Sequence, residues 1–261
     1  HYPVSTKIAL NIGIKSSKYD FVITTSSDAT PSSERWLSLL AKGFQYGDIV
    51  LGYSGMARQG GFMNRIFREY RFTESIAWLS AAIRHRTYAA SRNALGYKKS
   101  LYFDVRGFNH LNMNVGEDDL FVQRIATREN VSVVLSPRAT TSERIWGGWG
   151  WWWRRAKLMY TTHRHYPKGA MAPMNAELTM RVLFFASVVA AAVLMPWEFN
   201  MAVLALVLVR YFVVMFVMVR NARRLGEMGL AALHFVFDIV EPFLRMAVAI
   251  ASHKRYKKSW M

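Results

Sequence analysis

The chain has 261 residues, of which 34 are lysine or arginine and 17 are acidic, and it contains no cysteine. Without cysteine it can form neither a disulfide framework nor a cysteine-based metal site or nucleophile. The net charge of +17 indicates an anionic partner such as nucleic acid, membrane lipid or a phosphorylated substrate. Long apolar stretches predominate after about residue 175. They favour membrane lipid or a nucleotide over DNA or RNA as the anionic partner.

The chain begins with His1-Tyr2-Pro3, and the residues that follow resemble an internal segment of a domain. We therefore expect an incomplete N-terminus. Residues 7–18 predict an amphipathic helix, because apolar side chains recur among lysines. Residues 21–25 predict a short buried strand and residues 32–42 a helix. Asp28 follows the strand, at the edge where open α/β sheets bind their ligands. We expect it either to hold a divalent ion with a diphosphate or to cap the helix.

Three further segments have recognisable patterns. Residues 48–53 predict a strand that a glycine-rich loop follows, and residues 130–135 alternate like another strand. Residues 62–83 predict a helix with basic neighbours, which either packs on a protein core or lies on an anionic membrane surface. The seven histidines, including His163 and His165, show no metal-ligand spacing, so we expect them in polar surface.

Three adjacent carboxylates, Glu117, Asp118 and Asp119, lie between Gly116 and an apolar run. Acids in the first turn are a common feature of helix starts. A carboxylate held beside a helix N-terminus by bulky apolar neighbours also suits a general base that takes a proton from a hydroxyl. The pattern alone leaves both interpretations open.

A series of short motifs extends over about residues 5–166. In order, they are Lys7-x-Ala9-Leu10-Asn11-x-Gly13, Asp20, Asp28 with Pro31, Trp36-Leu37, Leu51-Gly52-Tyr53, Arg92-Asn93, Gly107-Phe108 and Gly116-Glu117-Asp118-Asp119-Leu120-Phe121-Val122. Their order and spacing resemble the family 2 glycosyltransferases, most closely the bacterial membrane-bound members. The resemblance implies an α/β fold of the Rossmann-like GT-A type, a nucleotide-diphosphate sugar as donor, a divalent metal (Mg or Mn) and an inverting displacement.

The resemblance also implies roles for individual residues. Asp28 matches the last acid of the family's Asp-x-Asp motif, which holds the metal and the donor diphosphate. Asp118, with Glu117 beside it, matches the catalytic base of the family's Glu-Asp motif. We expect Asp119 and Trp152 to contact the acceptor.

The chain departs from the family's pattern in three places. The first acid of the metal motif is replaced by Ser26. The segment that resembles Gln-x-x-Arg-Trp falls at Arg154-Arg155-Ala156-Lys157 and has no Gln. We still expect Arg154, Arg155 and Lys157 to approach the diphosphate. The first sheet strand and its uracil-contacting acid, expected upstream of Lys7, are absent.

Residues 145–155 combine five Trp with basic residues. An interfacial aromatic belt ahead of membrane helices explains most of these Trp, and we expect Trp152 to contact a sugar ring. Aromatic and basic side chains together are also typical of surfaces for single-stranded nucleic acid. No recognition fold surrounds them, so we expect no nucleic-acid partner.

Residues 178–195 and 199–219 are apolar runs of 18 and 21 residues, long enough to cross about 30 Å of hydrocarbon as helices. Arg210 interrupts the second run and needs a partner or the bundle interior. Basic residues flank the outer ends and none lies in the turn. The positive-inside rule then predicts a multi-pass inner-membrane protein whose catalytic domain is cytoplasmic. A buried soluble hairpin is the alternative.

Residues 230–252 place a polar stripe on an otherwise apolar helix. The stripe consists of His234, Asp238, Glu241, Arg245 and Ser252. We expect this helix either to lie at the cytoplasmic interface or to pack its stripe inside the bundle. The basic residues 253–258 are expected to contact anionic membrane lipid.

The sequence therefore predicts a GT-A domain over residues 1–172 and a membrane region over residues 173–261. The expected activity, of the kind used in polysaccharide biosynthesis, moves a sugar from a nucleotide-diphosphate donor to a hydroxyl of a glycan or lipid-linked acceptor, with inversion. The alternative is a catalytically inactive relative that serves as a membrane scaffold or regulatory subunit. Ser26 and the missing Gln favour the alternative, and the intact Glu117-Asp118-Asp119 opposes it.

Overall fold

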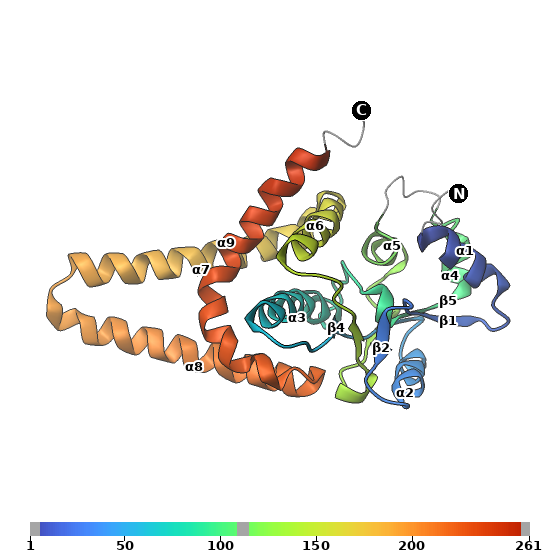
Figure 1. Ribbon diagram of the computed structural model, residues 1–261, viewed down its shortest axis with the longest axis horizontal. Coiled ribbons are helices and arrows are strands. Elements are labelled where there is room, and N and C mark those ends of the chain that lie inside the picture. The colour runs from blue at the N-terminus through green and yellow to red at the C-terminus, as the bar shows by residue number, and fades with distance from the viewer. Residues whose placement is uncertain (1–5, 109–114, 257–261) are drawn as a thin grey trace.

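The computed structural model of the chain describes residues 6–108 and 115–256, with side chains described as far as residue 252. A mixed α/β body with two small sheets carries a long helical hairpin that projects from it (Figure 1). The predictions made for His1-Tyr2-Pro3 and for the side chains of residues 253–258 lie outside the described part of the chain.

The larger sheet has four strands in the order β1-β5-β3-β6. β1 (Phe21–Thr24) and β3 (Ile49–Leu51) both run antiparallel to β5 (Leu95–Lys98), and β6 (Val131–Val133) runs parallel to β3. β3 lies inside the sheet and is fully buried. The strand expected at residues 21–25 exists but is only partly buried, because it pairs on one side with β5 alone among the described strands.

The smaller sheet has the order β2-β7-β4. Its central strand β7 (Thr141–Glu143) is antiparallel to β2 (Ala29–Pro31) and parallel to β4 (Ser54–Met56). Asp28 directly precedes β2, and its carbonyl oxygen accepts a hydrogen bond from the Arg144 N–H at 2.9 Å. This sheet therefore fixes the backbone of Asp28 beside the end of β7.

Short helices cover the sheets and connect the strands. They are α1 (Thr6–Ser16), α2 (Trp36–Lys42), η1 (Gly43–Gln45), η2 (Arg92–Ala94), α4 (Lys99–Asp104), α5 (Asp119–Ile125), η3 (Pro137–Ala139) and η4 (Thr161–His165), where η marks a 3-10 helix. α2 begins at Trp36 rather than at residue 32, because the Ser32 and Ser33 hydroxyls donate instead to the carbonyl oxygens of Pro137 and Arg138, each at 2.7 Å.

α3 (Phe62–Ile83) is the central helix of the body and spans the predicted residues. Trp78 and Leu79 join the main core with β3 and α5, whereas Phe67 and Tyr70 join a second core with α6 (Trp149–Tyr160) and α9 (Ala231–Tyr256). Of the two placements expected for this helix, packing on a protein core is confirmed, because large side chains on opposite faces are buried against other elements.

α7 (Lys168–Leu194) and α8 (Asn200–Leu225) form the projecting hairpin, and η5 (Trp197–Phe199) joins them (Figure 1). Both segments are long and apolar enough to span a membrane, and only 0% and 11% of their most apolar stretches are buried. A core helix of a soluble protein is mostly buried. The exposure of α7 and α8 therefore argues against the alternative of a buried soluble hairpin.

α9 (Ala231–Tyr256) follows η6 (Met228–Leu230) and crosses the base of the hairpin (Figure 1). Its polar stripe faces the helices beneath it. Asp238 accepts from Arg210 of α8 at 2.5 Å, and Glu241 pairs with Arg181 of α7 at 2.8 Å. The stripe thus packs inside the helical bundle, the second of the two placements expected, and it supplies the partner that Arg210 needs.

Glu241→Ala tests this packing. The Glu241 carboxylate is buried and pairs with Arg181 and, at 2.7 Å, with Arg245. Removing one partner from a buried ion pair leaves an uncompensated charge and costs about 3–5 kcal/mol. We expect a clearly lower Tm for the purified variant in detergent. Glu198→Ala, in the exposed hairpin turn, should melt like the parent, and equal Tm values for both variants would contradict the assigned packing.

Candidate functional site

Asp118 is held at the start of α5. Gly116 adopts φ +106°, a conformation that side chains disfavour, and turns the chain just before the helix. Asp118 is the N-cap, and its Oδ1 accepts the Asp119 N–H at 2.9 Å. Its Oδ2 accepts the Arg92 N–H at 3.3 Å. The carboxylate is therefore oriented by two backbone groups, and it is only half-buried, which leaves it accessible to a ligand.

The two neighbouring acids are more enclosed. Glu117 is buried and accepts from Arg92 Nη1 at 3.0 Å, which holds η2 against the start of α5. Asp119 Oδ2 accepts from the Thr162 hydroxyl at 2.5 Å and the Tyr166 hydroxyl at 2.6 Å. Burial, reinforced by the Asp118 charge, raises the pKa of Asp119 to about 7. Asp119 thus ties α5 to η4, and its contact with an acceptor stays a prediction.

Asp28 is linked to Asp118 through η2. Ser26 Oγ lies 2.6 Å from Asp28 Oδ1 and also 2.6 Å from Asn93 Oδ1. Asn93 directly follows Arg92, whose N–H binds Asp118. Partial burial raises the pKa of Asp28, but hydrogen bonds from Ser26 and from Trp146 Nε1 (3.4 Å) outweigh it, so the pKa lies below its ordinary value. Asp28 is therefore ionised at neutral pH.

The oxygens around Asp28 can be tested against the expected divalent ion. Asp28, Ser26 and Asn93 offer hard oxygen donors, the type that Mg²⁺ and Mn²⁺ prefer. Over residues 6–108 and 115–252, no three acidic or histidine side chains form a metal-ligand group. The set fits an ion bound through one carboxylate, with substrate phosphates and water completing the shell.

A small cavity of about 50 Å³ lies beside Asp118. Arg155 lines it and pairs with Glu143 at the end of β7. Of the other basic residues expected near the diphosphate, Arg154 is exposed and Lys157 lies 6.0 Å from the Trp153 ring centroid. Neither of these two is among the lining residues, so only Arg155 is brought to Asp118.

Two further arginines line the same small cavity. Arg71 Nη2 donates to Ser91 Oγ at 3.1 Å, and Arg92 reaches Glu117. Arg92 stands in one of the sequence motifs, although no phosphate role was expected for it. Arg71 lies in the middle of α3 among other basic residues, and no local signal distinguishes it from a surface arginine.

Trp152 lines this cavity as well, but its ring belongs to the core. It is 1% exposed and stacks on Phe67, with centroids 5.2 Å apart and planes at 2°. Tyr70 meets it edge-on at 5.1 Å, and Trp149 lies 5.0 Å away. Packing of α6 on α3 accounts for Trp152, and its contact with a sugar ring stays a prediction.

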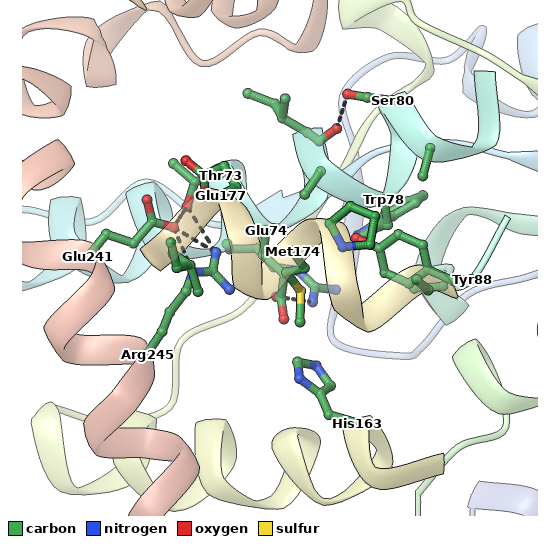
Figure 2. A pocket seen from close by; sticks show the side chains of 18 of the residues that line it. Thr73, Glu74, Trp78, Ser80, Tyr88, His163, Met174, Glu177, Glu241 and Arg245 are labelled. Carbon is green, nitrogen blue, oxygen red and sulfur yellow. Dashed lines mark hydrogen bonds and ion pairs between the residues drawn. The ribbon is translucent and has the colours of Figure 1, made fainter. Parts of the chain in front are cut away.

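A larger cavity of about 510 Å³ lies between α3, η4, α7, α8 and α9 (Figure 2). Asp118 lines it too, so this carboxylate borders both cavities. Glu74 of α3, Met174 of α7 and Arg245 of α9 line its walls (Figure 2). The cavity therefore joins the candidate site to the base of the hairpin.

His163 lies in the wall of the larger cavity. The expectation of a polar surface position is wrong for it and also for His234, which is buried against Glu69. The side chain of His163 is enclosed because η4 turns the ring between Tyr160 and Tyr166, at centroid distances of 4.2 and 4.7 Å. Burial lowers the pKa of His163 to about 4, so the imidazole is neutral at physiological pH.

Comparison of the chain with protein-family models finds no match, and comparison with curated proteins finds none. The resemblance to family 2 glycosyltransferases therefore stays a prediction. A functional assignment depends on the residues and cavities just described.

Asp119→Asn tests whether burial raises the pKa of the Asp119 carboxyl. The pKa of Asp119 is about 7 in the folded chain, against about 3.9 in an unfolded one. Between these values the folded state keeps a proton that the unfolded state releases, so the stability of the parent falls as pH rises from about 4 to about 7. Asparagine does not titrate, so we expect this fall to be smaller in the variant.

Thermal unfolding of the purified protein across this pH range measures the effect. The Tm difference between Asp119→Asn and the parent should shift in favour of the variant as pH rises. Glu129→Gln, at an exposed position, should keep the slope of the parent. An unchanged slope in Asp119→Asn would show that the carboxyl titrates normally.

Proposed function

We propose that the protein is a membrane-anchored glycosyltransferase of the family 2 type, with a GT-A fold. It transfers a sugar from a nucleotide-diphosphate donor to a hydroxyl of a glycan or lipid-linked acceptor, with inversion. The observation that carries the proposal is that Asp118, oriented by two backbone N–H groups, borders both an arginine-lined cavity and a larger cavity at the membrane hairpin.

Asp118 acts as general base in this proposal. The acceptor hydroxyl has a pKa far above 7, so it needs a carboxylate aimed at its proton. As the hydroxyl oxygen forms its bond to the anomeric carbon, its proton passes to Asp118. The bond from that carbon to the diphosphate breaks on the opposite side, and the leaving group takes the electron pair. One such displacement inverts the anomeric configuration.

The arginines of the small cavity contribute hydrogen-bond donors to the departing diphosphate, and each is also paired with a carboxylate: Arg71 with Glu74, Arg92 with Glu117 and Arg155 with Glu143. All three line the cavity, and fixed cations stabilise charge that develops on a leaving group. At about 50 Å³ the space is smaller than a nucleotide, so we assign to it only the phosphate end of the donor. Of the three basic residues expected at the diphosphate, Arg155 lines this cavity, whereas Arg154 and Lys157 do not.

A divalent ion, when bound, supplies further charge neutralisation to the diphosphate. Asp28 is the residue to hold it, with Ser26 and Asn93 as neighbouring oxygen donors. The link from Asp28 through Asn93 and Arg92 to Asp118 supports a common site for the metal, the donor and the base.

The hairpin anchors the enzyme in the inner membrane. Both of its outer ends return to the body (Figure 1), so the body lies on one side of the bilayer. Lys168 lies at the start of α7 and Arg220, Arg223 and Arg224 near the end of α8, whereas the turn carries no basic residue. This charge distribution supports a cytoplasmic catalytic domain in contact with membrane lipid.

The alternative is a catalytically inactive relative that serves as a membrane scaffold or regulatory subunit. Ser26 in place of a metal-motif acid favours it. The anchored, accessible Asp118 favours the enzyme, because a scaffold does not require a carboxylate between two cavities.

Asp118→Asn tests the enzyme. We expect the full chain in lipid nanodiscs, with Mg²⁺ or Mn²⁺, to release nucleoside diphosphate from at least one member of a panel of nucleotide sugars. Loss of a general base should lower this turnover by about 10²–10⁴-fold, while asparagine keeps the N-cap and the Tm. Asp104→Asn, at an exposed position of α4, is the matched control.

Two results would contradict the enzyme proposal. One is the absence of turnover from every nucleotide sugar, which favours the scaffold. The other is full turnover in Asp118→Asn, which removes this residue from the mechanism.

A further inference from the structure

The larger cavity has the size of a ligand site. Its volume of about 510 Å³ falls within the range of about 300–1,000 Å³ typical of small-molecule pockets. Its lining includes the polar side chains of Asp118 and His163 and also apolar residues of α3 and α8. A ligand that fills it must therefore be amphipathic.

His163 supplies the observation that points to a ligand. The side chain is 8% exposed, and its Nδ1 is buried without a hydrogen-bond partner. Buried polar atoms are normally paired, so an unpaired one beside a cavity is open to a ligand or a water molecule. Figure 2 shows the ring pointing from η4 into the cavity. A neutral imidazole offers one donor and one acceptor nitrogen, which suits a hydroxyl group.

The apolar side of the cavity reaches the hairpin surface. The apolar residues that line it include Ile76 and Ala77 of α3 and Val213, Val214 and Val217 of α8. Val213 is 53% exposed and Val217 45% exposed, on a helix apolar enough to lie in a membrane. The cavity therefore extends from the candidate base to a surface that contacts lipid tails when the hairpin is inserted.

The charges in the walls favour an uncharged head group. Arg181 pairs with Glu241 at 2.8 Å, and Arg210 pairs with Asp238 at 2.5 Å. Arg245 pairs with Glu241, which also accepts from Thr73 at 2.5 Å (Figure 2). The lining as a whole contains six arginines and six carboxylates, so it presents no large excess of positive charge to an anion, and hydroxyls match its polar groups better.

We propose that this cavity binds the acceptor, an amphiphile whose hydroxyl-bearing head lies between His163 and Asp118 and whose apolar chain lies between α3 and α8. The inference rests on the proposed function, because it makes this amphiphile the substrate that Asp118 deprotonates. It selects a lipid-linked acceptor over a free glycan. His163 is then a positioning residue that orients the head by a hydrogen bond.

Photo-cross-linking tests the location of the chain. The probe is a dodecyl glucoside with a diazirine at the end of its alkyl chain, added to the full chain in phosphatidylcholine nanodiscs. We expect cross-links on α8 at residues 213–217 and on α3 near Ile76. Ala77→Trp should remove most of them by filling the cavity, whereas Ala186→Trp, on the exposed face of α7, should not.

Variants of His163 test the position of the head. His163→Phe keeps a ring between the two tyrosines but has no polar atom, and His163→Asn restores a polar group near Nδ1. We expect His163→Phe to weaken glucoside binding about tenfold, as for one lost hydrogen bond, and His163→Asn to recover part of it. The per-O-methylated glucoside, which has no hydroxyl, should bind parent and His163→Phe with similar affinity. Displacement of the cross-linking probe measures each Kd.

Four outcomes separate a failure of the proposed acceptor site from a failure of the proposed function. Cross-links confined to lipid-facing residues such as Val189, and insensitive to Ala77→Trp, overturn the inference. Equal glucoside affinity in His163→Phe and the parent overturns the placement of the head. Donor turnover without cavity cross-links leaves the proposed function standing and removes this acceptor site. Cavity cross-links without turnover from any nucleotide sugar refute both the enzyme and the acceptor role, and leave an amphiphile-binding protein.

Discussion

The arrangement of this protein depends on ion pairs between α9 and the two long apolar helices. Arg181 and Arg210 lie within helices apolar enough to span a membrane, where an unpaired guanidinium is costly. Asp238 and Glu241 neutralise them from α9. Because both carboxylates lie on one face of that helix, the pairing sets where the hairpin leaves the body. It thereby also sets the shape of the cavity beside Asp118.

Within the body, three successive carboxylates have three different environments. Glu117 is buried against Arg92, Asp119 is buried among the Thr162 and Tyr166 hydroxyls, and Asp118 between them stays half-buried. The outer two stabilise the backbone by binding neighbouring elements, and this leaves the middle one oriented but accessible. An accessible carboxylate in a rigid setting is what a general base requires.

Patterns with a strong period were predictable. The helix at residues 62–83 and the hairpin follow from runs of apolar side chains, because burial in a core or in lipid demands such runs. The helix start at Asp118 follows from its local acids and glycine. Contacts between distant segments were not predictable in the same way. The burial of His163 and the stacking of Trp152 on Phe67 depend on how η4 and α6 meet α3.

The sequence by itself determined the apolar hairpin, the polar stripe of α9 and the acidic helix start, because each depends only on the type and spacing of neighbouring residues. Only the tertiary structure decided that the stripe turns inward onto Arg181 and Arg210, that η2 connects Asp28 to Asp118, and that one cavity joins Asp118 to the hairpin. The physical reason is that these hydrogen bonds and ion pairs join residues 26 to 67 positions apart. Their formation depends on the packing of whole elements, which local periodicity does not encode.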